Sequence, residues 1–212
     1  MKSLRILIVD DHAILRTGLR KILEDEFSGV AIGEAGDAEE ALDELRAAAW
    51  DIVVLDISLP GRSGLDLLPQ VRQNYPAAKV VVLSSFGDAQ FAVRALREGA
   101  MAFLTKERAA RELIDAIRTV VLNRRFVGAD LAEHLASLIA ADKPKSPHEA
   151  LSSREFEVFR LIASAKSVTE VSAELGLSVK TVSTYRARVL EKMGMASNAE
   201  LMQYALRHGL VH

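Results

Sequence analysis

Five polar side chains that could act on a phosphoryl group stand at or just after short apolar runs: Asp10, Asp11, Asp56, Ser84 and Lys106. Clustered carboxylates can hold Mg²⁺, a hard ion that prefers oxygen ligands and keeps several waters. A carboxylate beside such an ion can attack phosphorus, while the metal and an ammonium group neutralise the charge on the transferred group. We therefore expect Asp56 to attack, Lys106 to neutralise charge and the Ser84 hydroxyl to hydrogen-bond a phosphoryl oxygen.

Each of these residues also has an ordinary interpretation. Acidic residues at strand ends commonly cap the next helix or form a turn, and a lysine after a strand is usually solvated. A lone serine carries no information. Only their shared position, at the ends of four predicted strands, favours a common site.

The elements that must position these residues alternate between β and α patterns. Apolar, β-branched runs predict strands at residues 5–9, 30–33, 52–55, 80–84 and 102–104. Amphipathic stretches between them predict helices at 13–25, 38–48, 64–74, 88–98 and 108–122. This repetition predicts a five-stranded, doubly wound parallel sheet of the α/β class, in which ligands bind at the carboxyl ends of the strands.

The pattern changes after residue 122. A helical stretch at about 129–140 and a segment with two prolines, Pro144 and Pro147, predict a linker over residues 124–150. Helical patterns without strands follow at 153–165, 168–175, 179–193 and 198–207. We therefore expect two domains, residues 1–123 and 151–212, the second of them small and all-helical.

The two central helices of the second domain have helix-turn-helix proportions. Gly176-Leu177-Ser178 separates them, and Val182, Val189 and Met193 form one apolar stripe on the second helix. The opposite surface carries cations and hydroxyls. A solvated helix face is the simplest interpretation of such charges, but the helix-turn-helix spacing favours contacts to phosphates and base edges in a DNA major groove.

Composition sets broad limits. The net charge of −2 divides into −4 for residues 1–150 and +2 for residues 151–212, and the chain has no cysteine for a disulfide, a thiol nucleophile or a zinc ligand. The N-terminus runs directly into a strand pattern, and no apolar run approaches 18 residues. We expect a cytoplasmic protein without a membrane partner.

The first domain resembles bacterial response-regulator receiver domains over residues 4–122. The resemblance lies in residues 8–12 (Ile-Val-Asp-Asp-His), 54–64, 81–84 and 99–106. It implies a flavodoxin-like fold, phosphoryl transfer to Asp56 from a cognate sensor histidine kinase, and Mg²⁺ held by Asp11, Asp56 and the Ser58 backbone carbonyl, with Asp10 assisting through water. It also implies a switch in which a phosphoryl oxygen draws in the Ser84 hydroxyl and Phe103 rotates inward behind it.

Two positions bear on the details of this resemblance. Many receivers have proline after the lysine, whereas Glu107 follows here, so we expect a different loop after the fifth strand. Phe86 lies two residues beyond Ser84, and we predict that its ring shields the acyl phosphate from water. A Phe86→Ala variant that loses phosphate no faster than the parent would count against this.

The second domain resembles the LuxR-type DNA-binding domain, through residues 151–158, 170–185 and 192–194. Receiver and LuxR-type domains together form the NarL/FixJ arrangement of response regulators. Members commonly have glycine at the Ala165 position. The resemblance implies that Ser183, Thr184 and Ala187 face the bases of double-stranded promoter DNA. The side chains that it puts nearer phosphates are Lys180, Thr181, Arg186, Arg188 and Lys192.

The resemblance also supplies further partners. Leu201, Tyr204 and Ala205 repeat at helical spacing and are most simply core residues, but family members use this helix to form a homodimer on activation. RNA polymerase is a further candidate partner. In the family the receiver masks the DNA-binding helix until phosphorylation.

Two other classes of function fit parts of the sequence. An enzyme that hydrolyses an aspartyl phosphate typically has a second aspartate two residues after the first, but Ser58 occupies that position. We therefore expect no enzyme. A regulator controlled by a small ligand, as in autoinducer-binding LuxR proteins, would have no use for the acid set, although a phosphorylation-independent descendant would retain it.

Overall fold

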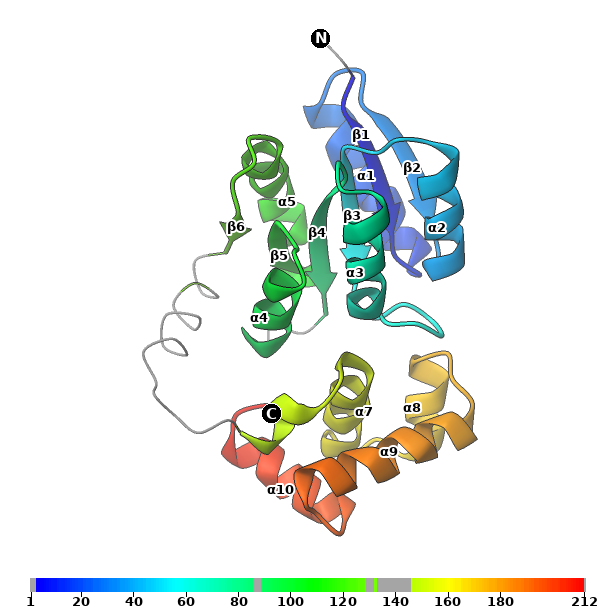
Figure 1. Ribbon diagram of the computed structural model, residues 1–212, viewed down its shortest axis with the longest axis vertical. Helices are drawn as coiled ribbons and strands as arrows, with labels where there is room; N and C mark the ends of the chain where they lie inside the picture. The colour runs from blue at the N-terminus through cyan, green and yellow to red at the C-terminus, as the bar shows by residue number, and fades with distance from the viewer. Residues whose placement is uncertain (1–2, 86–88, 129–131, 133–145, 212) are drawn as a thin grey trace. The chain divides into compact units, whose positions relative to one another are not determined.

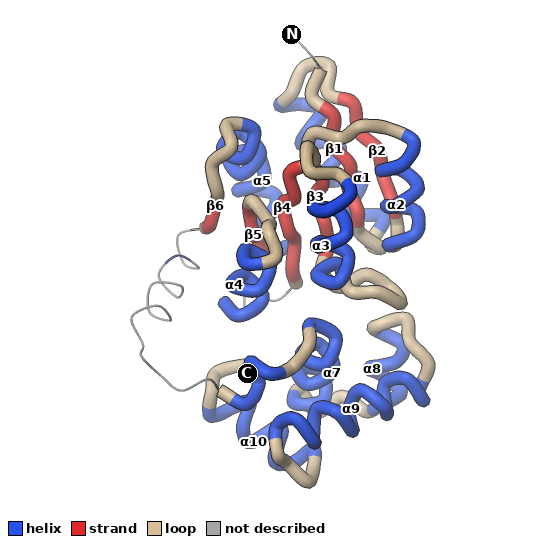
Figure 2. The backbone as a smooth tube through the Cα atoms, in the orientation of Figure 1, coloured by secondary structure: helices blue, strands red, loops and turns tan. Residues whose placement is uncertain are grey.

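The structure is a computed structural model that describes residues 3–85, 89–128, 132 and 146–211. The chain divides into two units, residues 1–140 and 141–212. Most of the predicted helix at 129–140 lies outside the described residues, and so does Phe86. Figure 2 colours strands in the first unit and only helices and loops in the described part of the second.

A parallel sheet runs through the first unit, in the order β2-β1-β3-β4-β5-β6 (Figure 1). Its central strands read as unbroken apolar runs because they are buried on both faces. The α/β fold class is thereby confirmed. The sixth strand was not predicted, since two residues are too few to give a pattern. The strands are β1 (Arg5–Val9), β2 (Ala31–Ala35), β3 (Ile52–Asp56), β4 (Lys79–Ser84), β5 (Ala102–Thr105) and β6 (Phe126–Val127).

Helices cover both faces of this sheet. On one face, Leu19 and Leu23 of α1 (Ala13–Glu26) and Leu113 and Ile117 of α5 (Lys106–Val121) pack on strand side chains in one apolar core. The other face carries α2 (Ala38–Ala47), α3 (Gly64–Asn74) and α4 (Ala89–Arg97). This two-sided cover leaves the carboxyl ends of the strands as the edge at which polar groups gather.

Gly64 lets α3 begin directly against the end of β3. A Cβ atom at this position would lie 1.9 Å from the backbone oxygen of Asp56, and the Gly64 amide donates to the Ile57 carbonyl at 2.8 Å. Only a residue without a side chain fits this approach. The glycine therefore fixes the backbone around Asp56.

The second unit is a helical bundle with well-formed helix starts. A 3-10 turn, η1 (Pro147–Ala150), precedes α7 (Ser153–Ala163), α8 (Val168–Glu174), α9 (Val179–Met193) and α10 (Asn198–Arg207). Ser152, Ser167 and Ser178 each accept a backbone N–H from the third residue beyond them, which satisfies donors in the first turn. Ala165, which directly follows the C-cap residue Ser164 of α7, has φ 65°, a left-handed conformation that favours glycine.

Candidate functional site

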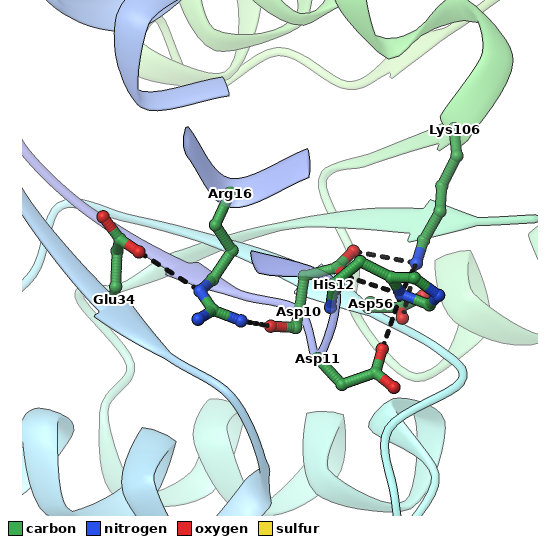
Figure 3. A network of polar contacts seen from close by, with 7 residues as sticks. All are labelled: Asp10, Asp11, His12, Arg16, Glu34, Asp56 and Lys106. Carbon is green, nitrogen blue, oxygen red and sulfur yellow. Dashed lines mark hydrogen bonds and ion pairs between the residues drawn. The ribbon is translucent and has the colours of Figure 1, made fainter. Parts of the chain in front are cut away.

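Three charged side chains meet at the carboxyl edge of the sheet. Asp10 directly follows β1, Asp56 ends β3 and Lys106 begins α5, and Figure 3 shows the lysine reaching down to the two acids. The Lys106 Nζ atom lies 2.8 Å from Asp10 Oδ2 and 2.8 Å from Asp56 Oδ2. Both carboxylates are fully buried, so the ammonium is their main source of compensating charge.

Burial perturbs the protonation of this group. It raises the pKa of Asp56 to about 6, although the attraction of Lys106 opposes this, and the charge of Asp10 adds to it. For Lys106, burial lowers the pKa of the ammonium, but attraction to Asp56 and Asp10 outweighs burial, and the net pKa is raised. The lysine therefore stays charged, while Asp56 is an ionised carboxylate of unusually high basicity at neutral pH.

Asp11 and His12 complete the cluster on its exposed side. The His12 Nδ1 atom lies 2.7 Å from Asp11 Oδ1 and 3.1 Å from Asp10 Oδ1. One ligand atom from each of Asp10, Asp11, His12 and Asp56 falls within 4.8 Å of the others. His12 was not among the predicted site residues, although its position directly after two predicted metal ligands was a usable signal.

The donor set fits a hard divalent cation. Opposite ligands of an octahedral Mg²⁺ are separated by about 4.2 Å, close to the spread of these atoms. The Asp56 Oδ1 atom is buried and has no hydrogen-bond partner among the described residues. An ion bound by the carboxylates would satisfy this oxygen, and buried polar atoms generally have such a partner.

The other predicted site residues lie around this cluster. Ser84 ends β4 and is fully buried, and Phe103 in β5 has only 1% of its surface exposed. The aromatic ring is therefore already inward in this structure. Ser58, two residues after Asp56, is half-buried. Lys106 and Glu107 begin α5 immediately after β5, so the position at which many receivers have proline belongs here to the helix.

The α9 helix presents the predicted DNA-binding surface. Its apolar stripe of Val182, Val189 and Met193 is buried against its own unit, as predicted. The predicted base-facing residues Ser183, Thr184 and Ala187 are all exposed. Among the predicted phosphate contacts, Lys180, Arg188 and Lys192 are exposed, whereas Thr181 and Arg186 are half-buried.

Two of these cations already have partners within the unit. Lys192 Nζ lies 2.6 Å from Glu155 Oε2, and the Glu155 side chain is only 4% exposed. Arg186 donates from Nε to Asn198 Oδ1 at 2.6 Å. Lys180 and Arg188 are consequently better available for a polyanion than Lys192 or Arg186.

Two of the three predicted dimerisation residues are core residues, which was their simplest interpretation. Leu201 and Ala205 are fully buried in the core of their own unit, because the face of α10 that carries them packs on α7. Tyr204 is half-buried, and its hydroxyl lies 2.5 Å from the His148 Nδ1 atom. A side chain without exposed surface cannot contact a second copy, so pairing through α10 would need its other face, where Leu206 is 56% exposed.

No helix in the described part of the chain combines the length and the apolar character that a membrane span requires.

Comparison with known proteins assigns both units. Residues 6–118 match the response regulator receiver domain, and residues 149–205 match the bacterial regulatory proteins of the luxR family. The chain is 36% identical over 208 residues to the response regulator UvrY of Escherichia coli, covering 98% of this chain and 95% of that protein. It is 35% identical over 211 residues to the response regulator GacA of Pseudomonas viridiflava, covering 98% of each.

A solved structure extends this similarity to three dimensions. RcsB from Salmonella enterica serovar Typhimurium, solved on a promoter in the presence of the phosphomimetic BeF3⁻, aligns with a TM-score of 0.66 and 25% identity. The alignment covers 96% of this chain and 98% of RcsB.

Proposed function

The chain belongs to the two-component response regulators that join a receiver domain to a LuxR-type helix-turn-helix domain, and from this membership we propose that it is a transcription regulator switched by phosphorylation of Asp56. The main support for this proposal is the environment of the Asp56 carboxylate. It is buried, basic and adjacent to a lysine, and its Oδ1 atom lacks a hydrogen-bond partner within the described residues. Residues 1–123 act as the receiver, 124–150 as the linker and 151–212 as the DNA-binding domain.

The phosphoryl donor is a phosphohistidine of a cognate sensor kinase. A carboxylate oxygen of Asp56 attacks phosphorus, the new P–O bond forms as the P–N bond breaks, and the electron pair of the broken bond stays on the histidine nitrogen. Lys106, which holds Asp56 at 2.8 Å in the resting state, turns its charge to the phosphoryl oxygens. The Ser84 hydroxyl, at the end of the neighbouring strand, donates to one of these oxygens, and Phe103 keeps its inward position behind Ser84.

Asp10, Asp11, Asp56 and the Ser58 backbone carbonyl are the groups that would hold Mg²⁺. The ion, when bound, neutralises charge on the transferred phosphoryl group. Three carboxylates against one lysine leave the resting cluster with excess negative charge, which favours uptake of a divalent cation.

Promoter DNA binds to α9. Lys180 and Arg188 make the main phosphate contacts because they are exposed, whereas Lys192 must first leave Glu155. Ser183, Thr184 and Ala187 face the base edges, and Ala187 can offer only a methyl contact, for instance to thymine. Thr181 and Arg186 lie beside this surface as supporting contacts.

Activation brings two copies together on a two-fold-related operator. The exposed face of α10 around Leu206 is the pairing surface, with Tyr204 at its margin, while Leu201 and Ala205 support the helix from the core. RNA polymerase is a partner of the DNA-bound dimer. The protein acts in the cytoplasm, and it regulates rather than turns over a substrate, since Ser58 cannot serve as the acid that hydrolysis of the aspartyl phosphate needs.

The test combines a phosphoryl mimic with two binding measurements. The full chain is treated with beryllofluoride and Mg²⁺, and self-association is followed by analytical ultracentrifugation and promoter binding by fluorescence anisotropy. We expect both to increase in the wild type and neither to change in Asp56→Ala. An equal response in the variant, or none in the wild type, would contradict the proposal. A Leu206→Asp variant should lose self-association while keeping its fold.

A further inference from the structure

The Arg16 side chain bridges strand β2 and the loop after β1 that carries Asp10 and Asp11. It lies in the first turn of α1, and its Nη1 atom donates to the backbone carbonyl of Asp10 (Figure 3). Its Nε atom donates to Glu34 Oε2 of β2 at 3.1 Å. The side chain is only 18% exposed, so this guanidinium is held in a protected position between the two elements.

The loop from Asp10 to His12 is also held by Lys106, whose ammonium lies 2.8 Å from Asp10 Oδ2, and by the Arg16 amide, which donates to the His12 carbonyl at 3.1 Å. The Asp10 amide donates to the Ala35 carbonyl at 3.1 Å, and the His12 amide donates to Asp10 Oδ1 at 2.8 Å. His12, which precedes α1, makes no side-chain cap hydrogen bond. Among the described residues, Lys106 holds the Asp10 carboxylate, whereas Arg16 is the side chain that holds the Asp10 backbone carbonyl from outside the loop.

We propose that Arg16 is a positioning residue for the metal ligands, with Glu34 as its anchor. By holding the Asp10 carbonyl, it fixes the direction in which the Asp10 and Asp11 carboxylates leave the backbone. This matters because Mg²⁺ demands near-ideal octahedral geometry at about 2.0–2.1 Å. The inference rests on the proposed function, since it concerns the same magnesium site.

The two hydrogen bonds of Arg16 require a guanidinium group, and a positive charge alone would not replace them. Arg16 uses two different nitrogens for two acceptors that lie on opposite sides of a planar group. A lysine has one ammonium on a flexible stem and cannot hold this fork. An Arg16→Lys variant should therefore keep most of the defect of Arg16→Gln.

Arg20 provides a matched control on the same carboxylate. Its Nε atom donates to Glu34 Oε1 at 2.6 Å, and it also contacts Glu24 and the Ile32 carbonyl. Both arginines lower the pKa of Glu34, the bond from Arg20 contributing most. In the described part of the chain, however, Arg20 makes no hydrogen bond or ion pair with the Asp10 loop, so its loss removes a comparable ion pair without releasing the ligands.

The experiment measures Mg²⁺ binding directly. Isothermal titration of the full chain with MgCl₂ gives the dissociation constant for wild type, Arg16→Gln, Arg16→Lys and Arg20→Gln. We expect Arg16→Gln to weaken Mg²⁺ binding about 10-fold or more, as loss of a group that orients metal ligands generally does, and Arg20→Gln to weaken it less than about 2-fold. Unfolding of each variant in EDTA, followed by the fluorescence of Trp50, separates a change in stability from a change in binding.

Three results would overturn the positioning role of Arg16 or the metal site on which it rests. Equal effects of Arg16→Gln and Arg20→Gln, or full rescue by Arg16→Lys, would overturn the positioning role while leaving the magnesium site intact. If Arg16→Gln does not fold, Glu34→Gln decides, because it weakens the anchor and keeps the loop contact; it should weaken Mg²⁺ binding more than Arg20→Gln. A wild type that binds no Mg²⁺ would overturn the proposed metal site, and this inference with it.

Discussion

Replacing Asp56 with asparagine should make the receiver unit more stable at neutral pH. The carboxylate is fully buried, and burial raises its pKa to about 6 despite the attraction of Lys106. Asparagine has the same shape without the charge and can still accept from Lys106, which also retains Asp10 at 2.8 Å. The variant therefore removes an unfavourable charge while keeping most contacts.

The magnitude follows from the two pKa values. A rise from 3.8 to about 6 means that ionisation of Asp56 costs the folded state about 3 kcal/mol. The folded protein holds this proton more tightly than the unfolded chain, so the cost is fully present above about pH 6 and disappears as the pH falls below the unfolded value. We expect Asp56→Asn to gain about 3 kcal/mol at pH 7.5 and about half of that at pH 5.

Urea unfolding in EDTA measures this gain, with the fluorescence of Trp50 as the signal. Trp50 is the single tryptophan of the chain and is buried in the receiver unit, so it reports on the unit that carries Asp56. Asp43→Asn is the control, since Asp43 is 76% exposed and should show no comparable gain. An Asp56→Asn variant that is no more stable than wild type, or whose gain does not change between pH 7.5 and 5, would show that the buried charge of Asp56 does not destabilise the receiver unit.

Three further predictions follow from single positions. Gly64→Ala should cost about 1–3 kcal/mol and slow phosphorylation by acetyl phosphate, because its Cβ would lie 1.9 Å from the Asp56 oxygen; an unchanged rate would contradict this. Lys180→Ala should weaken binding to all DNA sequences and reduce the salt dependence of affinity by about one phosphate contact, measured by anisotropy at several salt concentrations. Ala165→Gly should stabilise the second unit by about 0.5–1 kcal/mol in calorimetry, since it relieves a left-handed residue at φ 65°.

The sequence predicted most of the fold because the strongest signals are local. Buried parallel strands require unbroken apolar runs, and residues such as Asp56 and Ser84 stand at the ends of those runs. Once the sheet is parallel, these ends must share one edge, so the gathering of the acids followed from topology alone. Strand β6 was not predicted, because its two residues pair with β5 but are too few to form a periodic pattern.

Other features depend on distances that spacing does not encode. Leu201 and Ala205 have the same helical spacing whether they face the core or a second copy, and only the packing of α10 on α7 distinguishes the two. The contact of Arg16 with the Asp10 carbonyl depends on the conformation of a long side chain, which the sequence pattern does not specify. The pairing of Lys192 with Glu155, which lie far apart in the sequence, likewise required the folded unit.

Intact-mass spectrometry can detect whether Asp56 accepts a phosphoryl group. The full chain is incubated with acetyl phosphate and Mg²⁺, its intact mass is measured, and borohydride reduction marks the modified residue. We predict the mass of one added phosphoryl group, dependent on Mg²⁺ and located at Asp56, and no addition to Asp56→Asn. An unmodified wild type, a label on a different residue, or equal labelling of the variant would show that Asp56 is not the phosphoryl acceptor.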